Sequence, residues 1–89
     1  MIIKKYPVGD DPDFELDIHI VSKFLYADCD DMYFLVDATS GLQKRKFYLR
    51  VVKDLDRRTD PELETVSPQM TYLTAIEETD AVYFLFWDR

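Results

Sequence analysis

Residues 13–20, DFELDIHI, alternate apolar and ionisable side chains without a break. The apolar set is Phe14, Leu16, Ile18 and Ile20, and the ionisable set between them is Glu15, Asp17 and His19. A period of two is the pattern of a strand that buries one face and exposes the other to water. The segment therefore requires a sheet with one apolar face, and its wet face raises the question of what Glu15 and Asp17 are for.

Further short segments rich in β-branched and aromatic residues follow along the chain, each bounded by turn-forming residues. Such segments predict strands. The predicted strands are residues 2–6, residues 13–20 continuing through 21–27, and residues 32–36, 44–52 and 81–87. The last of these, AVYFLFW, is apolar on both faces, so we expect it in the centre of a sheet or under a helix.

The chain between residues 53 and 78 follows this pattern of strands bounded by turns less clearly. Residues 60–64, DPELE, offer an N-cap aspartate, a proline at the first helical position and two glutamates near the positive end of the helix dipole. They predict a short helix near residues 60–67. Residues 68–78 fit both a helical and an alternating pattern, and we favour a strand because their residue types are those that strands prefer.

Together these elements predict one small domain, residues 1–89, of the mainly β or α+β class. We expect an antiparallel sheet of five to six strands, either covered by the short helix or curled into a partial barrel. The chain has only two glycines to supply bulges and to close a barrel, which disfavours complete closure.

Cysteine content and hydropathy bear on where the protein works. The single cysteine excludes an internal disulfide bond, and small secreted proteins without disulfides are uncommon. The longest apolar run is seven residues, 81–87, whereas about 20 are needed to cross a bilayer. No apolar segment of a signal peptide follows the lysines near residue 5. We therefore expect a cytoplasmic protein without membrane contact.

The formal net charge of −7 is distributed unevenly. Residues 1–43 hold nine acidic and three basic side chains, residues 44–58 hold seven basic and two acidic, and residues 59–89 hold seven acidic and one basic. The overall sign disfavours direct binding to nucleic acid or to anionic membranes. Glu15, Asp17 or Asp37 on neighbouring strands would neutralise the basic segment at residues 44–58, since an opposite-charge pair across two strands contributes about 0.2–1 kcal/mol.

Motifs that bind cofactors or metals are missing from the sequence. Gly9 and Gly41 stand alone, so neither type of glycine-rich phosphate loop is present. One histidine and one cysteine are too few for a zinc site, and residues 28–31, DCDD, lack the glycine and the glutamate of a calcium loop. We expect no cofactor and no metal, and a hydrated turn at residues 28–31.

Catalytic side chains are also scarce. Cys29 lies between two aspartates, which raise the pKa of its thiol and suppress the reactive thiolate. His19 lies close in sequence to Asp17 and Ser22, a set that could supply a base and its nucleophile. A lone histidine on a charged strand face is more often an ordinary surface residue, because a base needs its nucleophile within hydrogen-bond reach. We therefore expect a protein that is not an enzyme.

Regularly spaced carboxylates lead to the first hypothesis about function. Side chains two residues apart on a strand face are separated by about 6.6–6.8 Å, so a row of them presents regular negative charge, as a nucleic-acid backbone does. The candidate partner-binding residues are Glu15, Asp17, Asp28, Asp30 and Asp31, with a second row at Glu77, Glu78 and Asp80. The hypothesis is a small acidic inhibitor, of the phage anti-defence or antitoxin kind, that occupies the basic groove of a nucleic-acid-handling protein. Simple solubility is the other explanation for this charge.

Aromatic content supports a second hypothesis. The chain has six tyrosines, six phenylalanines and one tryptophan, which 89 residues cannot easily cover. Exposed tyrosine and tryptophan side chains are typical of interfaces. If residues 81–87 form an edge strand, its backbone could pair with a second copy, with Tyr83, Leu85 and Trp87 at the contact. The alternative function is therefore a self-associating structural protein that forms a homodimer.

Overall fold

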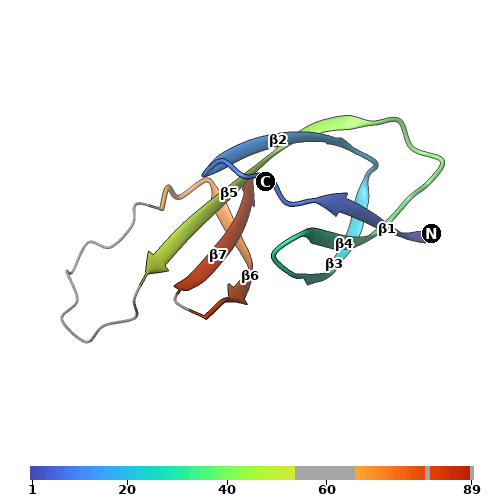
Figure 1. The fold of residues 1–89 in the computed structure, drawn as a ribbon. Coiled ribbons are helices and arrows are strands. Elements are labelled where there is room, and N and C mark those ends of the chain that lie inside the picture. The colour runs from blue at the N-terminus through green and yellow to red at the C-terminus, as the bar shows by residue number, and fades with distance from the viewer. Residues whose placement is uncertain (54–65, 80, 89) are drawn as a thin grey trace.

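The computed structural model describes residues 1–53, 66–79 and 81–88, which form seven strands and contain no helix (Figure 1). The strands are β1 Ile2–Pro7, β2 Asp13–Ile18, β3 Val21–Ala27, β4 Asp31–Val36, β5 Gln43–Lys53, β6 Met70–Glu77 and β7 Ala81–Asp88. They make a three-stranded sheet in the order β1-β4-β3 and a four-stranded sheet in the order β2-β5-β7-β6. All neighbouring strands are antiparallel, so the mainly β class is confirmed.

The prediction of a single sheet of five to six strands is wrong, because the chain changes sheets between β2 and β3. Ile18 is 1% exposed, whereas Ile20, two residues on, is 50% exposed. Val21 is again partly covered. The apolar alternation therefore changes phase at residues 19–20, and a strand whose phase changes cannot keep one face on the same core. Residues 13–27 form two strands in different sheets.

Other predictions concern the C-terminal half of the chain. Residues 70–77 form β6, which confirms the choice of strand over helix for residues 68–78. β7 lies between β5 and β6, which confirms a central position for residues 81–87. The predicted helix near residues 60–67 falls mostly on residues 54–65, which lie outside the described residues, and residues 66 and 67 are not helical.

Aromatic side chains from both sheets meet in the core. Phe34 of β4 stacks on Trp87 of β7 with ring centroids 5.4 Å apart, and its ring lies 6.1 Å from that of Phe47 of β5. Burial of a phenylalanine side chain contributes about 1.5–3 kcal/mol, so these rings hold the two sheets together. The buried apolar residues are Tyr6, Ile18, Ala27, Met32, Phe34, Val36, Phe47, Ile76, Ala81 and Leu85.

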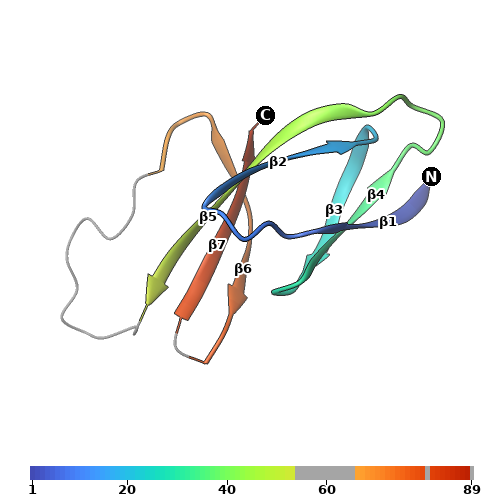
Figure 2. The same ribbon diagram turned by 45° about the horizontal axis from the view of Figure 1, so that its top comes forward.

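Two connections between the sheets, residues 19–20 and residues 37–42, lie side by side near the N-terminus (Figures 1 and 2). We call them the crossover end. The amide of Ile20 donates a hydrogen bond to Ser40 Oγ at 2.9 Å, and the amide of Asp37 donates one to the carbonyl of Ile20 at 2.9 Å. These contacts fix the two crossing segments to each other.

A third connection, residues 8–12, joins β1 to β2 and is held at both ends. At its start, the amide of Val8 donates a hydrogen bond to the carbonyl of Asp30, between β3 and β4, at 2.9 Å. At its end, the carbonyl of Pro12 accepts a hydrogen bond from the amide of Leu49, in β5, at 2.6 Å. The loop is thus tied to the three-stranded sheet at one end and to the four-stranded sheet at the other.

Candidate functional site

Three acidic segments meet between the sheets, and we call them the acidic end: Asp10, residues 28–31 and Glu78. They belong to the loop between β1 and β2, the turn between β3 and β4, and the turn after β6. The β3–β4 turn and the C-terminal end of β6 both lie away from the crossover end (Figure 2). These segments contribute to the wall of a cavity of about 240 Å³, which is lined by Val8, Gly9, Asp10, Cys29, Leu49, Ile76, Glu78 and Tyr83.

Asp28 shapes the turn between β3 and β4 with its own side chain. Its Oδ1 atom accepts hydrogen bonds from the amide of Asp30 at 2.9 Å and from the amide of Asp31 at 2.8 Å. Aspartate favours turns because its carboxylate can bond to the backbone in this way. The amide of Asp31, followed by that of Asp30, lowers the pKa of Asp28 below its ordinary value. The carboxylate that orders this turn is therefore fully charged at neutral pH.

The thiol of Cys29 responds to the combined field of the acidic end. Asp30 is the largest influence raising the pKa of Cys29, and Glu78, from the turn after β6, is the next. The raised pKa agrees with the sequence-based expectation of a thiol with little reactive thiolate. The part played by Glu78 shows that carboxylates far apart in the sequence act on one place in space.

The cavity combines apolar walls with an acidic rim. Ile76 is buried and Leu49 and Tyr83 pack against the core, whereas Asp10 and Glu78 are exposed. Lysine and arginine side chains have the matching chemistry, since each carries a charged head on an apolar stem. The cavity can therefore accept one long basic side chain, with its stem against the apolar walls and its head at the carboxylates.

Sequence reasoning identified some of this site and missed the rest. It predicted partner binding by residues 28–31 and by Glu78, but it assigned them to two separate acidic rows and did not predict the apolar walls. Packing of the two sheets against each other brings these residues together, and no short-range pattern in the sequence carries that information. Of the other acidic residues predicted with Glu78, Glu77 is the exposed last residue of β6, and Asp80 lies outside the described residues.

Glu15 and Asp17 lie on a different surface, the outer face of β2, and we call this pair the β2 row. Both side chains are exposed, as the alternation predicts. The pairing of β2 with β5 places Glu15 opposite Lys46 and Asp17 opposite Lys44. Each residue of the β2 row is therefore the cross-strand neighbour of a lysine, which is the arrangement expected if acidic neighbours offset the basic strand.

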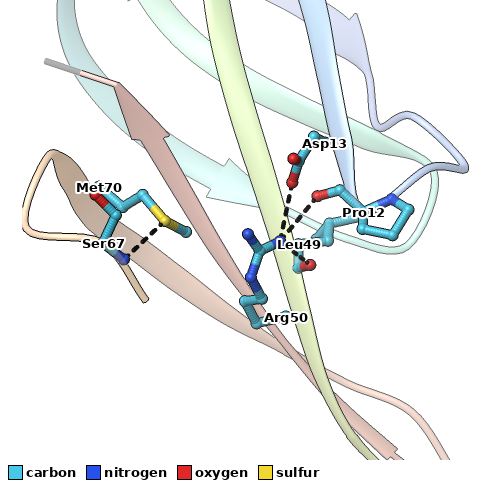
Figure 3. A network of polar contacts seen from close by, with 6 residues as sticks. All are labelled: Pro12, Asp13, Leu49, Arg50, Ser67 and Met70. Carbon is cyan, nitrogen blue, oxygen red and sulfur yellow. Dashed lines mark hydrogen bonds and ion pairs between the residues drawn. The ribbon is translucent and has the colours of Figure 1, made fainter. Parts of the chain in front are cut away.

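Arg50 of β5 continues this balance at the start of β2. Its Nη1 atom lies 3.0 Å from Oδ1 of Asp13 and donates hydrogen bonds to the carbonyls of Leu49, at 3.0 Å, and Pro12, at 3.3 Å (Figure 3). Affinity for nucleic acid depends largely on basic side chains that are left to neutralise phosphates. Arg50 is therefore already offset by Asp13 within the chain.

The C-terminal strand does not provide the predicted self-association surface. That prediction required an edge position, but β7 pairs with β5 on one side and with β6 on the other. Leu85 is fully buried, and Tyr83 and Trp87 pack against the core. The backbone of β7 is therefore already used within the sheet, and these three side chains hold the fold together instead of facing a second copy.

His19 has a structural position at the crossover end. Its Nδ1 atom lies 2.8 Å from the carbonyl oxygen of Ser40, and its amide donates a hydrogen bond to the hydroxyl of Tyr6 at 3.3 Å. Within the part of the chain that the structure describes, the His19 ring makes no hydrogen bond to Asp17 or Ser22. The same residues hold no group of three or more histidine, cysteine or carboxylate side chains placed to bind a metal ion.

The sequence matches no protein-family model and no curated protein, and the structure matches no solved structure. Among residues 1–53, 66–79 and 81–88, no helix is long and apolar enough to span a membrane.

Proposed function

We propose that the protein is a non-enzymatic binding protein whose acidic end engages a basic surface of another protein. The observation that carries this proposal is the convergence of three acidic segments around one cavity with apolar walls. Among the described residues, no ion pair involves Asp10, Asp30 or Glu78. Carboxylates around a cavity attract basic groups from outside the chain. The β2 row does not line this cavity.

The cavity gives this proposal a specific contact. A lysine or arginine of the partner would place its stem against Leu49, Ile76 and Tyr83 and its charged head beside Asp10 and Glu78. Arginine is among the residues that most often dominate the binding energy of an interface, especially when its side chain enters a well-packed pocket. We expect one such anchor at the cavity, surrounded by weaker charge contacts to residues 28–31.

The class of partner follows from the same chemistry. Grooves that bind nucleic acid are rich in basic side chains that neutralise phosphates. A small protein with a net charge of −7 and a concentrated acidic end would be steered to such a groove and would exclude the nucleic acid. The proposed role is therefore a cytoplasmic inhibitor of a nucleic-acid-handling protein, of the phage anti-defence or antitoxin kind.

Affinity co-purification of the tagged protein from its host, at low and at high salt, tests this function. We expect one basic nucleic-acid-binding protein to be captured at low salt, lost at high salt, and unable to bind nucleic acid while captured. The variant Asp30→Lys/Glu78→Lys should lose this partner. The matched variant Glu15→Lys/Asp17→Lys makes the same charge change on the β2 row and should retain it.

The outcomes of this experiment are distinct. Loss of the partner only in the Glu15→Lys/Asp17→Lys variant would move the binding site to the β2 row. Capture that depends on neither salt nor either variant would reject binding through charge. A captured partner that still binds nucleic acid normally would reject inhibition while leaving protein binding in place.

A further inference from the structure

The four edges of the two sheets are not equivalent. β1 and β3 form the edges of the three-stranded sheet, and β2 and β6 those of the four-stranded sheet. Register shifts interrupt the pairing of β3 with β4 and of β6 with β7, whereas β1 and β2 each pair with their neighbour over six consecutive residues without interruption. Bulges twist an edge away from further pairing, so β1 and β2 are the edges that remain regular enough to accept another strand.

These two regular edges are complementary in charge and in length. β1 carries Lys4 and Lys5, both exposed, and β2 carries the β2 row, Glu15 and Asp17. β1 also leaves Ile2 45% exposed and Ile3 67% exposed. Each strand has six residues. An edge with exposed isoleucines and lysines fits an acidic strand better than it fits water or a second basic strand.

Within one chain β1 and β2 do not pair, although the loop between them, residues 8–12, has a length that suits a hairpin. The hydrogen bonds of this loop explain why. The amide of Val8 is held by the carbonyl of Asp30, and the carbonyl of Pro12 is held by the amide of Leu49. Because these anchors belong to different sheets, the two strands are kept apart, and among the described residues neither edge pairs with a further strand.

We propose that β1 of one copy of the protein pairs antiparallel with β2 of a second copy. The register that overlaps both strands completely puts Ile2 opposite Ile18, Lys5 opposite Glu15, and Tyr6 opposite Phe14. It matches the faces of the two strands, since Tyr6 and Ile18 are buried on the core side of their sheets and Glu15 is exposed on the other. An aromatic pair and an ion pair thus fall on opposite faces of the new contact.

The charges across this contact would alternate in sign. Lys46 of β5 faces Glu15 within one copy, and Lys5 of the other copy would face Glu15 from the open side. Opposite-charge pairs across strands are favourable, and like-charge pairs are unfavourable by similar amounts. The contact does not use Asp30 or Glu78, so its failure and the failure of partner binding at the acidic end can be told apart.

Sedimentation analysis of two charge-reversal variants tests the pairing. Lys4→Glu/Lys5→Glu makes both edges acidic, and Glu15→Lys/Asp17→Lys makes both edges basic. We expect wild type to self-associate, each variant alone to associate at least about tenfold more weakly, and an equimolar mixture of the two to recover association, because acidic edges then meet basic ones. The variant Lys23→Glu makes a similar charge change on the interrupted edge β3 and should associate like wild type.

Hydrogen exchange of the wild-type protein supplies a second measurement that needs no folded variant. The amides of β1 and β2 that point away from β4 and β5 should gain protection as concentration rises, while the outward-pointing amides of β3 and β6 should not. A wild-type protein that stays monomeric at millimolar concentration would overturn the proposal, as would a mixture that fails to recover association. Protection of the outward-pointing amides of β1 and β2 that is independent of concentration would also overturn it, because that result indicates a hairpin within one chain.

Discussion

The crossover end and the acidic end are built from the same turn chemistry but use it differently. Asp37 accepts hydrogen bonds from the hydroxyl and amide of Thr39, as Asp28 accepts them from two amides in its own turn. At the crossover end, Ser40 then bonds to a second segment and closes the structure. At the acidic end, the carboxylates of Asp10 and Glu78 instead line a cavity. The two turns have similar composition, so the segment that each turn contacts decides whether it stabilises the fold or lines a candidate binding surface.

The largest effect should come from Ile18, the buried last residue of β2, which precedes the crossover end. Ile18→Ala removes a side chain that is 1% exposed and should lower the free energy of unfolding by about 2–5 kcal/mol. Ile20→Ala alters a side chain that is 50% exposed and should change it by less than about 0.5 kcal/mol. Urea unfolding of both variants checks this contrast, and equal losses would contradict the change of phase at residues 19–20.

Removal of the side-chain hydrogen bonds of Ser40 should have an intermediate effect. Ser40→Ala deletes the acceptor for the Ile20 amide and the donor to the carbonyl of Asp37, and should lower the free energy of unfolding by about 0.5–1.5 kcal/mol. At the acidic end, Asp30→Asn/Glu78→Gln removes like charges and should leave stability unchanged or slightly higher. Urea midpoints that fall equally in both variants would erase the distinction between the two ends.

Acid should weaken both ends through their turn aspartates. Turn hydrogen bonds lower the pKa of Asp28 and of Asp37 from the ordinary value of 3.8. Their contribution to stability is therefore complete above that value and is lost as the pH falls through the lower pKa of the folded state. Urea midpoints measured between about pH 5 and about pH 2 should fall for wild type. They should fall less steeply for Asp28→Asn and Asp37→Asn, and identical slopes would show that these carboxylates are not involved.

The smallest effect should appear in the reactivity of Cys29. Asp30 and Glu78 raise the pKa of its thiol, so Asp30→Asn/Glu78→Gln should increase the thiolate fraction and speed alkylation by iodoacetamide severalfold at pH 8. Glu15→Gln, on the β2 row, should leave the rate unchanged. A rate that responds equally to both variants would show that the carboxylates of the acidic end do not act together on Cys29.

Local patterns predicted the faces of the strands well. The alternation in residues 13–18 placed Ile18 inside and Glu15 and Asp17 outside, and the structure confirms this. The change of sheet after Ile18 escaped prediction because Ile20 continues the apolar alternation while lying outside the core. Hydrophobicity alone cannot show that the strand has ended, since the hydrogen bonds that turn the chain come from Ser40, far along the sequence.

The candidate site shows the same limit. The sequence predicts residues 28–31 and Glu78 as separate acidic groups. Their convergence at one cavity depends on packing of β3 against β6. The expected role of Tyr83, Leu85 and Trp87 failed for a related reason, since strand order decides whether an aromatic strand is an edge or a centre. Residue type predicts which face is apolar, and only the topology decides what that face meets.

The position of Trp87 gives the molecule a built-in optical reporter. It is the only tryptophan of the chain, its ring stacks on Phe34 of the other sheet at 5.4 Å, and the guanidinium carbon of Arg45 lies 4.0 Å from the ring centroid. Indole emission depends on polarity and on nearby cations, so separation of the two sheets must change its wavelength and intensity. A single fluorescence signal therefore follows the docking of the sheets, without any added label.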